Sequence, residues 1–309
     1  MTAAVLLALM PVVLVIVLAA ILRHREFLDA TFWPQAERLG YYVLLPCLFF
    51  HSLATADLNS VPVSALALTL VIATCSVALV VLATRPALAL DGPAFTSVFQ
   101  GSIRFNNYVG VTLAAGLFGA HGVALAAICN AAIVPTVNIL CVLVFARFGH
   151  APLNAWGVVQ QLVRNPLIMS SFAGILFQWV GFSVPEGVGA ALKILGGASL
   201  PLGLLCVGAA LEVGTARQWL GPVAVSSLFK LLLMPVATAA CSLVIGLEGQ
   251  ALTTALLFQS LPTASSAYIL ARQLGGDAPL MAGVTAAQTV LAVASIPLVM
   301  SALSIWLPL

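Results

Sequence analysis

Long apolar segments alternate with short polar ones along the whole chain. The first, residues 3–22, is an unbroken run of twenty apolar residues that includes Pro11, and about 20 such residues are what a helix needs to cross the hydrocarbon core of a membrane. Hydropathy marks nine further segments, at residues 40–55, 61–83, 94–119, 122–145, 166–180, 190–211, 222–245, 251–270 and 278–303. The pattern predicts an all-α polytopic membrane protein with ten transmembrane helices and short loops.

The composition agrees with a chain embedded in lipid. Charged residues make up 6% of the chain and hydrophobic residues 62%, whereas roughly a quarter of a soluble domain is charged. These values exclude a soluble enzyme, a disordered chain, a collagen and a coiled coil, and they make the lipid bilayer the expected surrounding. The net charge is +2 and the basic residues form no patch, so we expect no nucleic acid among the partners.

The basic residues of the loops predict how the chain is oriented. If the N-terminus faces outward, the loops on the opposite side contain Arg23, Arg25, Arg38, Arg85, Arg147, Arg164, Arg217 and Arg272. The outer side then contains only Lys193. Because cytoplasmic loops carry the excess of Lys and Arg, we expect both termini outside and a location in the cell membrane, specifically the inner membrane of a bacterium.

Two landmarks recur at nearly the same offset, close to half the chain. Leu45-Pro46 returns as Leu200-Pro201 after 155 residues, and the polar stretch that begins at Asn106 is matched by the one at Pro262 after 156. This spacing predicts two five-helix repeats, residues 1–150 and 151–309. Since five is odd, the second repeat would enter the membrane from the opposite side. Inverted repeats of this kind are typical of transporters, which bind substrate at the repeat interface near the midplane.

Two predicted spans carry polar residues near their centres, where they are poorly suited to contact lipid. The candidate substrate-binding residues are Arg104, Asn106, Asn107, Tyr108, Gly110 and Thr112 in the fourth segment and Pro262, Thr263, Ser265 and Ser266 in the ninth. Breaks in helices at this depth are tolerated where they line a cavity, and the half-helix N-termini that they create favour anions. The alternatives are polar packing between helices and a simple proline kink.

Two basic residues lie inside predicted spans. Arg104 and Lys230 have no acidic residue in any span to pair with, so each either serves an anion pathway or extends its charge toward the headgroups. The nine acids lie in loops or at helix ends, and His51 lies near an outer end. We therefore expect a cavity without a carboxylate or a proton relay, and uniport of the anion. Sodium coordination by hydroxyls at the ninth-segment break stays open as an alternative.

The six cysteines fall within apolar segments and form no CxxC pair. We interpret them as packing residues, and we expect no metal site, no cofactor and no catalytic residues. An intramembrane enzyme remains a distant alternative. Such an enzyme would need paired aspartates, an HExxH motif or a Ser/His pair within the membrane. The chain has no acidic residue in the middle of a span and no HExxH motif.

Four groups of residues carry a family resemblance. They are Tyr42-Val-Leu-Leu-Pro46, Arg104-Phe-Asn-Asn-Tyr-Val-Gly110 with Leu117-Phe-Gly119, Arg164-Asn-Pro166, and Leu261-Pro-Thr-Ala264 with Ala271-Arg-Gln-Leu-Gly275. Their order and spacing resemble the auxin efflux carrier family, which includes plant PIN-type carriers and bacterial permeases, over nearly the whole chain. The chain departs from the family at Gly110-Val-Thr112, where PIN-type carriers have Gly-x-Pro, and at Ser265-Ser266, where relatives often carry Asn.

The resemblance implies a fold similar to sodium/proton antiporters and bile-acid carriers. Spans 4 and 9 would cross at broken centres, spans 1, 2, 6 and 7 would form a scaffold, and spans 3–5 and 8–10 would form a moving, elevator-type transport domain. It also implies a carrier, not an enzyme, for a small organic anion such as an auxin-like or dicarboxylic acid. A sodium-coupled bile-acid or arsenite type carrier of the same fold is the alternative, and a homodimer is left open.

Overall fold

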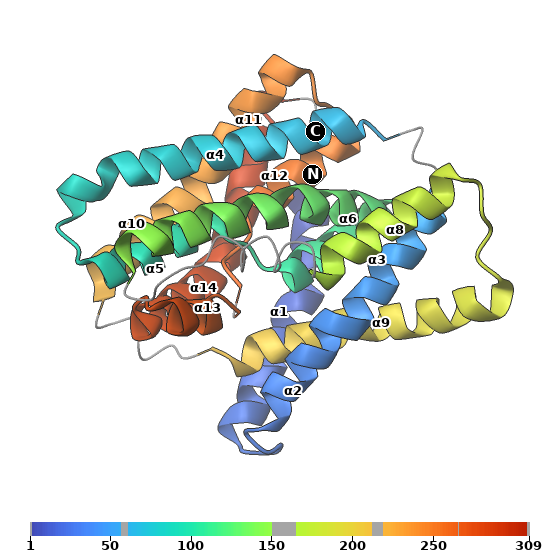
Figure 1. Ribbon diagram of the computed structural model, residues 1–309, viewed down its shortest axis with the longest axis horizontal. Coiled ribbons are helices and arrows are strands. Elements are labelled where there is room, and N and C mark those ends of the chain that lie inside the picture. The colour runs from blue at the N-terminus through green and yellow to red at the C-terminus, as the bar shows by residue number, and fades with distance from the viewer. Residues whose placement is uncertain (1, 57–60, 150–164, 212–218, 265, 308–309) are drawn as a thin grey trace.

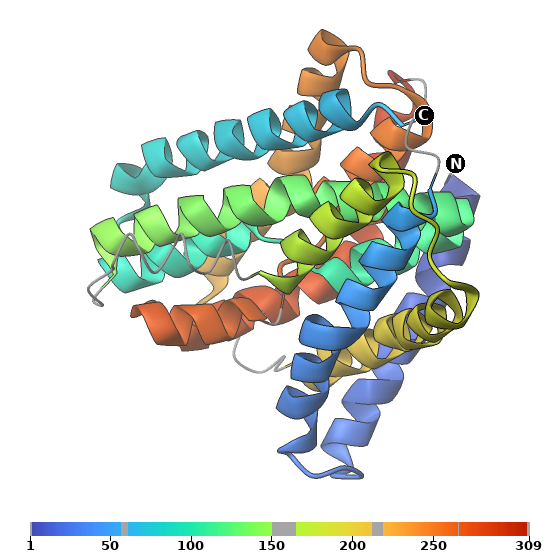
Figure 2. The same ribbon diagram turned by 45° about the vertical axis from the view of Figure 1, so that its right-hand side comes forward.

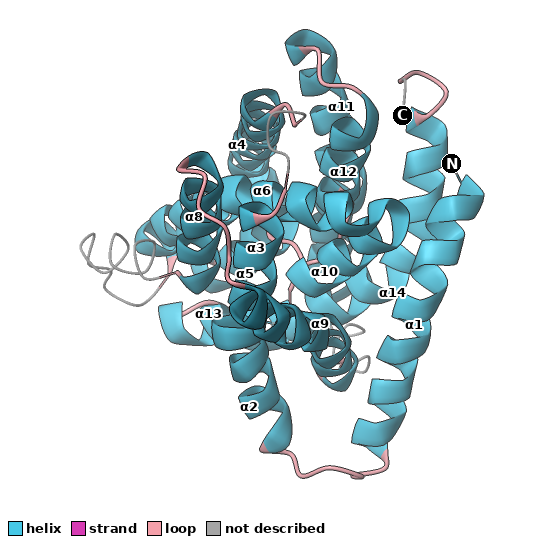
Figure 3. Cartoon of the chain, turned by 90° about the vertical axis from the view of Figure 1, so that its right-hand side faces the viewer, coloured by secondary structure: helices cyan, strands magenta, loops and turns pink. Residues whose placement is uncertain are grey.

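The computed structural model describes residues 2–56, 61–149, 165–211, 219–264 and 266–307. Every regular element in these ranges is a helix (Figure 3). The helices are α1 (Thr2–His24), α2 (Phe32–Leu39), α3 (Leu45–Ala54), α4 (Val63–Leu88), α5 (Gly92–Ile103), α6 (Asn107–Phe148), α8 (Pro166–Trp179), α9 (Glu186–Ala209), α10 (Leu220–Leu228), α11 (Met234–Ile245), α12 (Gly249–Gln259), α13 (Ser266–Leu274) and α14 (Ala278–Leu303).

Two π-helical turns make longer continuous helices out of these pieces. The turn η1 (Gly40–Leu44) joins α2 to α3, and η4 (Phe229–Leu233) joins α10 to α11. Each turn lies just before a proline, Pro46 or Pro235. A proline inside a helix donates no hydrogen bond and its ring crowds the carbonyl four residues earlier, and a widened turn relieves that crowding.

The structure agrees with a polytopic all-α membrane protein. Six helical stretches in the described ranges are long and apolar enough to cross a membrane, and these are Ala4–His24, Val63–Leu88, Gly92–Phe148, Glu186–Ala209, Leu220–Ile245 and Ala278–Leu303. The helix Pro166–Trp179 is apolar but shorter. The stretch Gly92–Phe148 covers two of the segments that hydropathy marks, and each of the other helices agrees in position with one. Twenty apolar residues satisfy their backbone in lipid only by forming a helix.

The helices pack in two groups (Figures 1 and 2). In one group, α1 packs along α9, and α3 packs against both α8 and α9, toward the right and bottom of Figure 1. In the other, α4 packs against α6 and α11, α12 packs against α6, and α5 packs against α10 and α14. The long helix α6 contacts both groups, since it also packs against α1, α3, α8 and α9.

The fourth predicted span is interrupted where it is most polar. Helix α5 ends at Ile103, the backbone of Arg104 is extended (ψ 163°), and α6 begins after Asn106, whose backbone is also extended. Gly119, which has the left-handed φ of 58°, then divides α6 between the predicted segments 94–119 and 122–145. A glycine adopts this conformation without steric cost, so Gly119 forms the turn at the end of the fourth span.

The ninth predicted span is interrupted as well. Helix α12 ends at Gln259, and the chain is not helical again until α13 begins at Ser266. Pro262 lies inside this interruption. The missing N–H and the ring of a proline prevent a helix from continuing through it without distortion. The break that the sequence predicts from Pro262 is therefore present.

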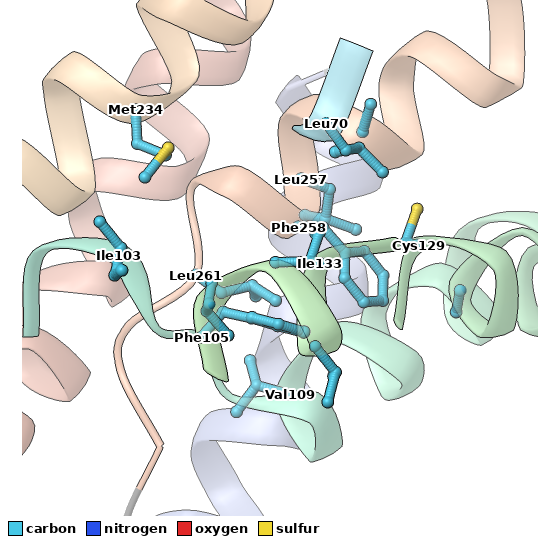
Figure 4. Packing of buried hydrophobic residues seen from close by; sticks show 14 of the residues in the cluster. Leu70, Ile103, Phe105, Val109, Cys129, Ile133, Met234, Leu257, Phe258 and Leu261 are labelled. Carbon is cyan, nitrogen blue, oxygen red and sulfur yellow. The ribbon is translucent and has the colours of Figure 1, made fainter. Parts of the chain in front are cut away.

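Buried apolar side chains fill the space around the two interruptions. The rings of Phe105 and Phe258 lie 5.8 Å apart, and Leu261 and Val109 lie beside them (Figure 4). All four are at most 5% exposed. In lipid this close packing, and not exclusion of water, holds helices together, so the apolar cluster supports the two irregular segments.

Candidate functional site

The two interruptions meet directly. The backbone N–H of Asn106 donates a hydrogen bond of 2.8 Å to the backbone carbonyl of Pro262. In a continuous helix, each of these two groups would form its hydrogen bond with the backbone of the same helix. Irregular backbone within a membrane must find such partners or line a cavity, and here the two breaks satisfy one another.

A cavity of about 560 Å³ lies beside this crossing. Its lining comes from α2 and η1, from both breaks, and from the far half of α6. The lining residues are Pro34, Glu37, Arg38, Tyr41, Tyr42, Arg104, Phe105, Asn106, Asn107, Tyr108, Val134, Val137, Asn138, Ala264, Ser266, Ile269 and Leu270. Among the residues predicted to bind substrate, the cavity brings together Arg104, Asn106, Asn107, Tyr108 and Ser266.

The charge of the cavity is mostly basic. Arg104 is half-buried, and its Nη1 donates a hydrogen bond of 3.0 Å to Oδ1 of Asn138. Arg38 is exposed and lines the same cavity. Glu37 lines it too, so the expectation of a cavity without a carboxylate is wrong. The sequence places Glu37 in a loop, whereas α2 extends the second helix back to Phe32 and includes it.

The neighbouring residues Asn106 and Asn107 have different roles. Oδ1 of Asn106 accepts hydrogen bonds from the backbone N–H groups of Tyr108 (3.1 Å) and Val109 (3.3 Å), so Asn106 is the N-cap of α6. This cap occupies part of the half-helix N-terminus that was predicted to bind an anion. Oδ1 of Asn107 is buried and has no hydrogen-bond partner in the described part of the chain. Asn107 lines the cavity, and its side chain does not cap the helix as that of Asn106 does.

Similar proteins agree with a transport function. A sequence model of the family described as membrane transport protein matches residues 156–300. Over 270 residues the chain is 24% identical to an uncharacterized transporter of Methanothermobacter thermautotrophicus, covering 85% of this chain and 86% of that one. It is 26% identical over 251 residues to a putative malonate transporter of Rhizobium meliloti, covering 76% and 75%. The chain is therefore similar to membrane proteins that are named as transporters.

Tyr108 joins the crossing to the neighbouring group of helices. Its ring lies directly against the backbone of Gly203 on α9, and a Cβ atom added at Gly40 would lie 2.7 Å from its hydroxyl oxygen. The hydroxyl is buried and has no partner in the described ranges. Gly40 and Gly203, which have no side chains, thus leave space for the Tyr108 ring, and Tyr108 is one of the residues that line the cavity.

Several predicted site residues of the carrier lie away from the cavity lining. Gly110 lies inside helix α6, so the break does not rely on it; a Cβ there would lie 2.6 Å from Leu261 Cδ1. The hydroxyl of Thr112 donates to the carbonyl of Tyr108 in its own helix. Pro262 offers its carbonyl to the other break. Ser265 lies outside the described residues.

Sequence reasoning missed two amides that hold the site in place. Asn138 fixes the Arg104 guanidinium. Gln288 of α14 accepts a hydrogen bond of 2.9 Å from the Thr263 N–H, and its Nε2 donates 3.0 Å to the carbonyl of Gly101. Each is an amide in an otherwise apolar span. An amide in an apolar span indicates a polar contact, but it does not identify the partner. Arg104 lies 34 residues from Asn138 along the chain, and Gly101 lies 187 residues from Gln288.

Proposed function

We propose that this protein is a secondary transporter that moves a small organic anion, such as a mono- or dicarboxylate, across the cytoplasmic membrane by alternating access. The anion binds in the cavity at the crossing of the two breaks. The observation that carries the proposal is Arg104, a cation at a helix interruption with Asn107 beside it in the same cavity. A cation within a membrane span is costly unless it serves a function or a partner.

The donors of the cavity suit a carboxylate. The guanidinium of Arg104 has five N–H donors in a planar fork, and the bond to Asn138 uses one of them. Such forks bind carboxylates in bidentate geometry. The side-chain amide of Asn107 and the hydroxyls of Tyr108 and Ser266 offer further hydrogen bonds. A relative named a putative malonate transporter and the second arginine of the cavity, Arg38, make a short dicarboxylate the first substrate to test.

We propose the finer architecture as well: ten transmembrane helices in two inverted five-helix repeats. The bounds of the helices support it. The stretch Val63–Leu88 and the stretch Leu220–Ile245 are each 26 residues long and lie 157 residues apart. Helices α5 and α12, which precede the two breaks, begin at Gly92 and Gly249, again 157 residues apart, and each follows an acidic residue. Two halves of one design would produce this agreement.

The proposed division into scaffold and transport domain follows the two packing groups. Spans 1, 2, 6 and 7 correspond to α1, α2–α3, α8 and α9, which pack on one another. The other spans surround the crossing. In this arrangement Tyr108 of the transport domain lies against Gly40 and Gly203 of the scaffold. Because Arg38 belongs to the side assigned to the cytoplasm, the cavity of this conformation faces the cytoplasm and both termini lie outside.

A transport assay tests the proposal. Purified protein in proteoliposomes is given a panel of labelled mono- and dicarboxylates, with malonate first, at equal pH on both sides. We expect saturable uptake that unlabelled carboxylates compete and organic amines do not. Protein-free liposomes measure passive entry. Saturable uptake of amines without uptake of any carboxylate would overturn the proposal.

A further inference from the structure

A lysine is buried next to the crossing. Lys230 lies in the π-helical turn η4, is 0% exposed, and its Nζ has no hydrogen-bond partner in the described part of the chain. It does not reach the surface, so the interpretation that its charge extends to the headgroups is wrong. A buried ammonium without a partner is costly, and a buried group of this kind loses its charge instead. Lys230 is therefore a buried amine that has no counter-ion among the described residues.

The described helices that pack against the turn of Lys230 contain no acid that could pair with it. The turn η4 packs against α4, α5, α10, α11 and α14. The titratable or charged residues in these helices are Cys75 and Arg85 on α4 and Cys241 on α11, and Arg104 follows α5. The guanidinium of Arg85 lies over aromatic rings near the start of α5, whereas Lys230 lies beside the end of α5.

The position of Lys230 along α5 follows from its neighbours on either side. One turn earlier, the hydroxyl of Ser226 donates to the carbonyl of Val98 on α5. One turn later is Met234, which is buried like Ile103, the last residue of α5. Lys230 lies between Ser226 and Met234, in a turn that packs against α5. It is thus next to the last turn of α5, which is the turn that leads into the first break.

A chain of hydrogen bonds links this position to both breaks. Nε2 of Gln288 donates to Oγ of Ser226 at 3.3 Å and to the carbonyl of Gly101 at 3.0 Å. Its Oε1 accepts from the N–H of Thr263 in the second break. The hydroxyls of Ser227, one turn before Lys230, and of Thr263 are buried without partners among the described residues. Ser227, three residues before Lys230 in the same helix, offers an acceptor to an ammonium at this position.

We propose that Lys230 carries the proton that this transporter moves together with its organic anion. When the crossing rearranges and water reaches Lys230, the lone pair of the amine binds a proton and becomes a fourth bond at nitrogen. On the other side the ammonium gives this proton to water, and the neutral amine is buried again. Nothing is oxidised or reduced. This inference rests on the proposed function, because the organic anion is the solute that moves together with the proton.

The proposal replaces the expectation of uniport. That expectation counted only acids and histidines as proton carriers. A lysine in a span is a proton carrier when it is buried without a counter-ion, since its protonation state then depends on access to water. Arg104 does not serve this role, because a guanidinium keeps its proton in proteins.

The test measures protons and malonate together. Wild-type proteoliposomes with trapped pyranine, the potential clamped at zero and the outside one pH unit more acidic than the lumen are given labelled malonate, and protein-free liposomes correct for passive entry. We expect malonate to accumulate by about tenfold, with about one proton entering per malonate. Lys230→Gln and Lys230→Met should transport malonate at equal pH but accumulate none with the gradient. Lys193→Gln, which changes an exposed lysine of α9, should behave as wild type.

Two results would overturn the role of Lys230. The first is malonate entry by the wild type without proton entry, a measurement that needs no variant to fold. The second is gradient-driven accumulation that persists in Lys230→Gln or Lys230→Met. Malonate flux at equal pH tests the proposed function separately. If the wild type shows no such flux, the proposed carboxylate transport itself is wrong, whatever the role of Lys230.

Discussion

At the scale of single residues, the same residue type serves as a helix cap at one position and as a candidate ligand at the next. Asn106 and Asn107 were both predicted to bind substrate. Both line the cavity, but the side-chain oxygen of Asn106 accepts hydrogen bonds from two backbone N–H groups. Composition and spacing could not separate the two roles, because the role depends on which residue is the last one before the helix begins.

This difference predicts two distinct mutant phenotypes. Asn106→Ala removes an N-cap, which costs about 0.5–2 kcal/mol of stability, so the thermal transition of the purified protein should fall. Asn106→Ser should restore the transition, because serine also caps. Asn107→Ala should leave the transition unchanged and weaken malonate uptake by about tenfold, the effect of one hydrogen bond to a charged group. Equal stability losses in both alanine variants would contradict the assignment.

The charge of Arg104 gives a second prediction. Arg104→Gln removes the cation from the cavity and should raise the KM for malonate by about 10- to 100-fold, whereas Arg104→Lys keeps a cation and should raise it less. Arg25→Gln, which neutralises an exposed arginine after α1, serves as the control for net charge. If the Gln and Lys variants behave alike in uptake assays, Arg104 is a lipid-facing charge and not a substrate ligand.

At the scale of helices, the structural role of a glycine depends on the residues that pack against it. Gly110 was predicted to bind substrate at the first break, yet it lies inside α6, where close packing against Leu261 and Phe258 requires a glycine. Gly119 has the positive φ that makes the turn. Hydropathy and Pro262 predict that the two spans are interrupted. They do not predict that Gly110 is a packing residue, because its contacts, Leu261 and Phe258, lie about 150 positions away in the chain.

A matched pair of substitutions in α6 tests the packing of Gly110. A Cβ at Gly110 would lie 2.6 Å from Leu261 and 3.0 Å from Phe258, whereas a Cβ at Gly116 would meet only Ala8, at 3.5 Å. Gly110→Ala should therefore destabilise the protein by about 1–3 kcal/mol, as overpacking does, while Gly116→Ala should be neutral or stabilising by about 0.5–1 kcal/mol, as expected for a helix. Thermal unfolding in detergent measures both, and equal stabilities would show that the crossing accommodates the methyl group.

At the scale of the whole molecule, the apolar segments predict most of the helical architecture. A run of about 20 apolar residues leaves the backbone no alternative to a helix in lipid. The partners of the polar residues could not be predicted in the same way. Asn138 for Arg104 and Gln288 for Thr263 are brought together by the packing of separate helices, and no periodicity in the chain records which amide meets which break. The burial of Lys230 also results from the packing of separate helices, so the sequence pattern did not predict it.

The whole-molecule account has one central claim, that an organic anion binds where the two broken helices cross. A structure of the purified carrier determined at saturating malonate tests it most directly. We predict malonate in the 560 Å³ cavity, with its carboxylate oxygens about 3 Å from the Arg104 guanidinium and the Asn107 amide. Malonate bound elsewhere, with this cavity empty in a protein that transports it, would contradict the claim.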